Sequence, residues 1–171
     1  MRPRGRAEPA RSRFYYDLRD PECYLWAERV NAELPVVPEW VPVALASAPA
    51  FRCAEERAAF EEDLARRASE QGLQPLRMPA SWPAETDLAP RAATYAKQIG
   101  RAVAFSLATF RQAFAAGRDL DDVDTILIAA AACEIHPNAM TRALESERVR
   151  TALEETTAQA RIEAVPAVVG A

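Results

Sequence analysis

The chain has 171 residues, of which 50% are hydrophobic and 27% are charged, and its formal net charge is -4. This composition is typical of one globular domain with a sizeable core, and it excludes a wholly disordered chain. The acidic balance argues against nucleic acid as the main partner, and no stretch approaches the ~20 apolar residues of a membrane span.

Residues 1–12 form a basic leader, in which Arg2, Arg4, Arg6 and Arg11 are accompanied by one acid, Glu8. We expect a disordered, solvated segment, with an arm for an anionic partner as the alternative. No apolar run follows the arginines, so the segment lacks the pattern of a secretory signal.

The cysteines at positions 23, 53 and 133 are an odd number, and the chain shows no secretory signal. A disulfide framework needs paired cysteines and an oxidising compartment. We therefore expect free thiols and a cytoplasmic protein. Cys133 follows four alanines on an apolar helix and is expected to pack in the core.

The first structured segment is predicted to be a β-α-β unit. An aromatic run over 13–18 has strand character and leads into Asp20-Pro21. Asp at the N-cap and Pro at the first helical position are a strong helix start. The helix should end near Leu34, before Pro35. A second strand is predicted over 36–46, parallel to the first and joined by a right-handed crossover.

The middle of the chain is predicted to be helical. Apolar residues recur there at spacings of three and four, which is the pattern of helices that bury one face. Gly72 and Gly117 are natural helix ends, and four prolines interrupt the connection over 73–90. The predicted helices cover 55–71, 91–116, 121–135, 137–144 and 147–164.

The chain returns to strand composition at its end, over 165–171, with a proline at the entrance. Strands at both ends with helices between them indicate an α/β fold that carries an all-helical insertion. We assign 13–48 and 155–171 to the α/β core and 49–154 to the helical insertion.

Three segments resemble the DsbA-like thioredoxin fold, in the branch of 2-hydroxychromene-2-carboxylate isomerase and the kappa-class glutathione transferases. The segment FYYDLRDPECYL over 14–25 resembles the first strand and active-site helix start, which that branch writes roughly F-Y-D-x-x-S-P-x-x-Y-L. Residues 95–120 resemble its helical insertion, and AVPAVV over 164–169 resembles its cis-proline strand. The likeness covers 13–170 and implies a thioredoxin-like fold with a large helical insertion before the cis-proline strand.

The resemblance also implies a site. Asp20 stands where this branch has its catalytic serine and where the disulfide oxidoreductases have the attacking cysteine of C-P-x-C. Pro21 matches the family proline, and Cys23 matches the second cysteine. Val165 corresponds to the residue whose backbone pairs with glutathione, and Pro166 to the cis-proline. The implied cofactor is glutathione or another low-molecular-weight thiol, and the implied partner is a small-molecule substrate, with an aromatic one and a homodimer among the alternatives.

Asp20 fits neither family scheme well. It has no thiol for disulfide exchange, and when ionised it has no proton to donate and repels a thiolate. The helix N-terminus favours the charged form of a carboxyl. Asp20 is therefore either an N-cap alone or a carboxylate that acts as a general base or binds another ligand. For Cys23 the alternatives are core packing and a reactive thiol.

Other candidate residues are weaker. His136 is the only histidine and precedes Pro137, where we expect it to close a helix; no cluster has the spacing of a metal site. Lys97 and Arg101 lie one turn apart on the predicted long helix and either face an anion or are solvated. The tryptophans either line a pocket for an aromatic substrate or pack in the core: Trp26, Trp40 and Trp82.

The chain ends at Ala171, whereas members of this branch continue with another strand and helix. Three explanations stay open: a fragment, a second chain that completes the sheet, or a dispensable segment. The leading functional hypothesis is a thiol-dependent isomerase, transferase or oxidoreductase weakened by Asp20. The alternatives are a non-catalytic binding or scaffold protein, and redox chemistry through Cys23 alone.

Overall fold

The computed structural model describes residues 12–45 and 49–163. Strand β1 (Arg13–Tyr16) leads into helix α1 (Pro21–Ala27), and a short helix α2 (Val30–Glu33) precedes strand β2 (Glu39–Pro42). The two strands are parallel, with Arg13 opposite Glu39 and Tyr16 opposite Pro42. The predicted parallel pair joined through a helix is therefore confirmed.

The bounds of this unit differ from the prediction. The helix predicted over 21–34 is divided at Arg29, whose φ is -124°. The strand predicted over 36–46 is shorter, because Pro35 and Pro38 have no amide hydrogen to donate to a ladder. Between these prolines, Val36 and Val37 are 70% and 64% exposed.

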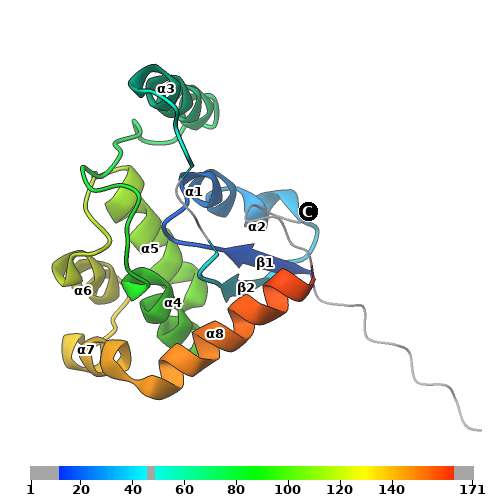
Figure 1. Cartoon of the computed structure of the whole chain (residues 1–171). Coiled ribbons are helices and arrows are strands. Elements are labelled where there is room, and N and C mark those ends of the chain that lie inside the picture. Colours follow the sequence, from blue (N-terminus) through cyan, green and yellow to red (C-terminus); the bar gives the residue numbers. More distant parts are fainter. Residues whose placement is uncertain (1–11, 46–48, 164–171) are drawn as a thin grey trace, which may run out of the picture.

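The helical part packs around this small sheet (Figure 1). Its helices are α3 (Ala54–Glu70), α4 (Leu88–Gln98), α5 (Ala102–Phe114), α6 (Val123–Ala132), α7 (Pro137–Glu145) and α8 (Glu147–Ile162). Helices α4 and α8 lie against β2, and α1 lies against α5, which in turn contacts α6. Helix α3 stands apart on the side of α1 (Figure 1).

The single long helix predicted over 91–116 is wrong, because the chain forms α4 and α5 with a break at Gly100. Gly100 has φ +75°, and its amide donates to the carbonyl of Lys97 at 3.1 Å. Glycine adopts this left-handed conformation without steric cost and ends a helix. Lys97 therefore closes α4, whereas Arg101 is the N-cap of α5.

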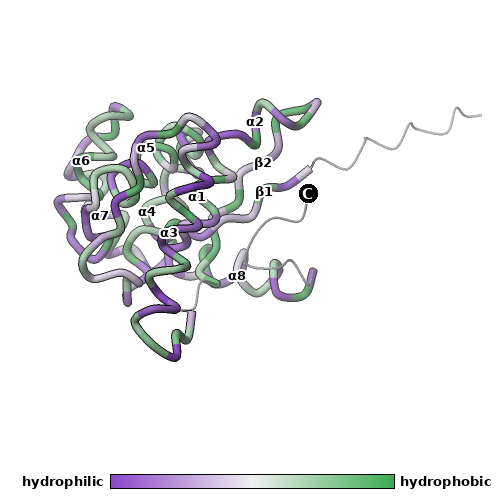
Figure 2. The backbone as a smooth tube through the Cα atoms, turned by 90° about the horizontal axis from the view of Figure 1, so that it is seen from above, coloured by the Kyte–Doolittle hydropathy of each residue, from purple (hydrophilic) through white to green (hydrophobic). Residues whose placement is uncertain are grey.

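Two cores lie on the two faces of the sheet, since successive strand side chains point to opposite faces. Phe14 and Tyr16 enter the large core, and Tyr15 enters a small core beneath α8 with Val41 and Ala160. Along most helices hydrophilic and hydrophobic residues alternate (Figure 2), as expected of helices that bury one face. The fully buried aromatic side chains of the large core are Tyr16, Tyr24, Phe105, Phe110 and Phe114.

The predicted terminal strand, with Val165 and Pro166, lies outside the described residues. The division into a core and an insertion at residues 48 and 154 stays a prediction. Within residues 12–45 and 49–163, no helix combines the length and apolar character needed to cross a membrane.

Candidate functional site

The turn between β1 and α1 carries the residues that the sequence singled out. Asp20 is the N-cap of α1: its backbone is extended, and its Oδ1 accepts a hydrogen bond from the amide of Glu22 at 2.9 Å. Pro21 occupies the first turn and is buried. The N-cap predicted from Asp20-Pro21 is confirmed, and it places a carboxyl group at the positive end of a helix.

A buried ion pair fixes this turn. Asp17 is fully buried, and its two carboxylate oxygens accept from Nε and Nη2 of Arg19 at 3.0 and 2.8 Å. The Arg19 side chain is only 11% exposed, and its Nη1 donates to the carbonyl of Thr86 at 3.4 Å. Trp82 Nε1 donates to the carbonyl of Arg19 at 3.0 Å. Sequence reasoning missed this pair, although an Asp two residues before an Arg was a usable signal.

The segment that holds Arg19 is itself anchored to the start of α6. Asp121 accepts from the amides of Glu85 and Thr86 at 2.9 and 3.0 Å and from the Thr86 hydroxyl at 2.5 Å. The turn that carries Asp20 is therefore tied to the helical part of the chain. Such support holds a functional side chain in one geometry.

The carboxyl group of Asp20 has a raised pKa of about 6. Burial is the main cause, because it disfavours the charged form, and the negative charges of Asp17 and Glu22 add to it. The hydrogen bond from the Glu22 amide acts in the opposite direction. Burial thus outweighs the helix N-terminus, which by itself favours the ionised carboxylate. The result is a group that gains and loses its proton near neutral pH.

Cys23 lies one turn further along α1 and is 0% exposed. Its thiol donates to Oδ2 of Asp20 across 3.8 Å. Burial, followed by the charge of Asp20, raises the pKa of the Cys23 thiol well above its ordinary value. The thiol is therefore protonated and enclosed, which agrees with packing rather than with a reactive cysteine.

The family comparison agrees with the fold. The DSBA-like thioredoxin domain model matches residues 13–168. The chain belongs to the DsbA-like thioredoxin family. No curated protein matches the sequence.

Solved structures share the fold. 2-Hydroxychromene-2-carboxylate isomerase is 20% identical with a TM-score of 0.78, over 92% of this chain and 81% of the isomerase. A probable DsbA oxidoreductase from Streptomyces coelicolor is 19% identical with a TM-score of 0.72, over 93% and 77%. A candidate protein disulfide isomerase from Nitrosomonas europaea is 15% identical with a TM-score of 0.70, over 92% and 81%.

The three tryptophans of this DsbA-like chain do not line one common pocket. Trp82 stacks on Phe60 with ring centres 5.9 Å apart, beside the turn that carries Asp20. Trp40 packs edge-on against Phe14 in the large core. Trp26 lies beneath the guanidinium of Arg29, 3.8 Å from its ring centre. Trp82 and Trp40 are therefore core residues, as the more conservative interpretation expected.

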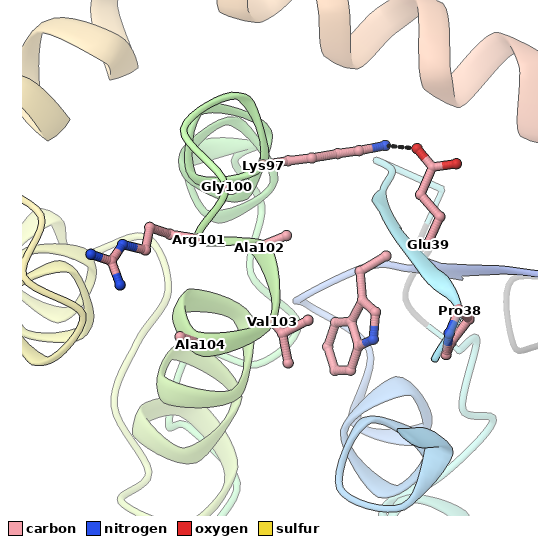
Figure 3. Close-up of a pocket in the computed structure, with 9 residues that line it drawn as sticks. Pro38, Glu39, Lys97, Gly100, Arg101, Ala102, Val103 and Ala104 are labelled. Carbon is pink, nitrogen blue, oxygen red and sulfur yellow. Dashed lines mark hydrogen bonds and ion pairs between the residues drawn. The ribbon is translucent and has the colours of Figure 1, made fainter. Parts of the chain in front are cut away.

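Two cavities of about 410 and 180 Å³ lie at the amino ends of the strands and share Glu39 and Lys97. Asp20 follows the carboxyl end of β1 and lines neither of them. Lys97 Nζ pairs with Glu39 Oε1 at 2.7 Å, whereas Arg101 points away from the cavity (Figure 3). Lys97 and Arg101 thus do not form a joint anion site, because Lys97 is paired with Glu39 and Arg101 points away from the cavity.

The remaining candidates lie far from Asp20 in the chain. His136 is the N-cap of α7, where its Nδ1 accepts from the amide of Asn138 at 3.2 Å, so the expectation that it closes a helix is wrong. Cys53 is exposed before α3, and Cys133 is buried at the end of α6. In the part of the chain that the structure describes, no group of three or more His, Cys, Asp or Glu residues could hold a metal ion.

Proposed function

We propose that this DsbA-like chain is a thiol-dependent enzyme of the isomerase type, in which Asp20 handles the proton. The observation that carries the proposal is the state of the Asp20 carboxyl group. By the family resemblance it corresponds to the catalytic serine or cysteine, and burial raises its pKa to about 6. A general acid or base works best when its pKa lies near the working pH.

The contact between Asp20 and Cys23 supports a thiol as the cofactor. Here a protonated thiol already donates to this carboxylate, at 3.8 Å. A thiolate would be repelled by the ionised carboxylate, so Asp20 suits glutathione or another low-molecular-weight thiol in its protonated form. When bound, such a thiol would supply a soft nucleophile, and Asp20 would accept its proton. Val165 and Pro166, which the family resemblance assigns to glutathione, lie outside the described residues and stay predictions.

Disulfide exchange through this turn has no support from the described geometry. Asp20 has no sulfur, and the Cys23 thiol is fully buried with a raised pKa. Exchange needs an accessible thiolate. An isomerase or transferase is therefore favoured over an oxidoreductase among the three activities that the sequence suggested.

A binding or scaffold protein without catalysis is the second candidate. It is favoured by the capping bond from the Glu22 amide to Asp20, at 2.9 Å, which alone gives the carboxylate a structural role. In that case Asp20→Ala would lower the free energy of unfolding by ~0.5–2 kcal/mol, the contribution of an N-cap, and there would be no enzymatic turnover to lose.

The test combines glutathione titration calorimetry with turnover of a hydroxychromene carboxylate as the first probe substrate. Asp20→Asn keeps the cap and removes the proton, whereas Asp20→Ser restores the family residue. Asp122 caps α6 with an exposed carboxylate, so Asp122→Asn is the matched control. We expect the wild type to bind the thiol. We expect Asp20→Asn to lose turnover ~10²–10⁴-fold and the control Asp122→Asn to keep it.

Two results would contradict the proposal. Absence of thiol binding by both the wild type and Asp20→Ser would remove the thiol dependence. Thiol binding with turnover that Asp20→Asn leaves unchanged would remove the role of the carboxyl group. Thiol binding without any turnover of the probe, followed by a survey of other substrates that also fails, would favour the binding protein.

A further inference from the structure

We infer that Cys23 is a positioning residue for Asp20: its buried S–H group and the amide of Glu22 together fix the direction of the Asp20 carboxylate. The inference rests on the proposed role of Asp20. It assigns a function to the remaining half of the family's C-P-x-C spacing in a chain where the attacking cysteine is absent.

The two oxygens of Asp20 have different partners. Oδ1 accepts from the Glu22 amide at 2.9 Å, and Oδ2 accepts from the Cys23 sulfur at 3.8 Å. An aspartate has broad freedom about its last torsion, so one hydrogen bond does not fix the positions of both oxygens. A second hydrogen bond, donated to the other oxygen, fixes the orientation of the carboxylate. A carboxylate has about four lone-pair sites, and two of those of Asp20 accept from the described residues Glu22 and Cys23. Asp20 is also partly exposed, so a ligand can approach the carboxylate.

The Cys23 thiol stays protonated, and therefore remains a donor, while the Asp20 carboxyl group gains and loses its proton. Cys23 is 0% exposed, and burial together with the charges of Asp20 and Asp17 outweighs a backbone hydrogen bond at Asp17 that favours the thiolate. Tyr16, whose hydroxyl is 2.6 Å from that of Ser106, also interacts with Cys23. Burial raises the pKa of Tyr16 as well, so the tyrosine is neutral. A protonated thiol that donates to the Asp20 carboxyl group favours its ionised form over its neutral form, and this contact lowers the pKa of Asp20.

The spacing along α1 explains why this pairing arises. The N-cap and the third helical residue lie on the same side of the first turn. In C-P-x-C this places two sulfurs together, and in D-P-x-C it places a carboxylate against a thiol.

The titration of the Asp20 carboxyl group tests the inference directly, by carbon-detected NMR on the free protein. The Asp20 signal is assigned by its loss in Asp20→Asn. Cys23→Ala should raise the pKa of Asp20 by about half a unit, because a weak donor to the ionised form is lost. Cys23→Ser is somewhat smaller but supplies a stronger donor, so the pKa of Asp20 should stay at or below the wild-type value.

Cys133→Ala is the matched control, since Cys133 is also buried but belongs to α6, and it should leave the Asp20 titration unchanged. An unaltered pKa in folded Cys23→Ala would overturn the inference. If Cys23→Ala does not fold, a pKa in Cys23→Ser above that of the wild type would overturn it. The titration needs no substrate, so its outcome is separate from the turnover of Asp20→Asn, which reports on the proposed function.

Discussion

The raised pKa of Asp20 predicts a stability that depends on pH in an uncommon direction. Most native carboxyl groups have lowered pKa values and lose their stabilising effect in acid. Asp20 instead moves from an ordinary value of 3.8 to about 6. Its contribution is fully present below pH 3.8 and is lost as the pH rises through 6, because the folded protein must then ionise a buried carboxyl group.

The magnitude follows from the shift. About two units at ~1.4 kcal/mol per unit give ~3 kcal/mol, and since Asp20 keeps part of its surface exposed we expect about 2 kcal/mol. Asp20→Asn retains an N-cap of similar strength and has no proton to lose. The free energy of unfolding of Asp20→Asn relative to the wild type should therefore rise by about 2 kcal/mol between pH 4 and pH 7.

Urea denaturation at four pH values between 4 and 7.5 measures this difference. All other titrating groups are shared by the two proteins and cancel to first order. Asp122→Asn is the control for the removal of one capping carboxylate, because Asp122 caps α6 and is exposed. Parallel curves for Asp20→Asn and the wild type would refute the reasoning, since burial would then not control the Asp20 carboxyl group.

Two further predictions concern the same turn. Asp17→Ala should lower the free energy of unfolding by ~3–5 kcal/mol, because it leaves Arg19 almost buried without its carboxylate partner. The control Glu70→Ala removes an exposed ion pair and should lower the free energy of unfolding by less than ~1 kcal/mol. Equal losses in Asp17→Ala and Glu70→Ala, measured by urea denaturation, would contradict this account. Iodoacetamide on the folded protein should label exposed Cys53 and spare buried Cys23, as read by peptide mass spectrometry. Fast native labelling of Cys23 would instead support a reactive thiol.

The β-α-β unit could be predicted because its signals are local. Asp20-Pro21 marks the start of α1 whatever surrounds it, and the aromatic run before it is strand-forming in most contexts. The break at Gly100 could not be predicted in the same way. Apolar residues continue at helical spacing on both sides of Gly100, and a glycine inside a helix lowers stability by only ~1 kcal/mol. The pattern therefore does not distinguish one continuous helix from two.

The position of Asp20 at the start of α1 was predictable from the sequence, whereas its protonation state was not. Motif and spacing placed Asp20 and Cys23 in the first turn of α1, where the structure brings them to 3.8 Å. The pKa of Asp20 depends on how deeply the turn is covered, and that cover comes from distant parts of the chain. The Trp82 ring reaches the carbonyl of Arg19 from 63 residues away. A helix N-terminus is visible in sequence, whereas desolvation by remote segments is not.

The family resemblance expects serine or cysteine where this chain has Asp20, and the helix N-terminus acts differently on an aspartate. For a thiolate, the amides and the partial positive charge stabilise an anion that attacks. For Asp20, the Glu22 amide still binds the carboxylate at 2.9 Å, but burial opposes the charge and brings the pKa to about 6. The group becomes a weak nucleophile with a readily exchanged proton. These properties are the basis of the proposed role of Asp20, which is to move protons on a bound molecule and not to break a disulfide.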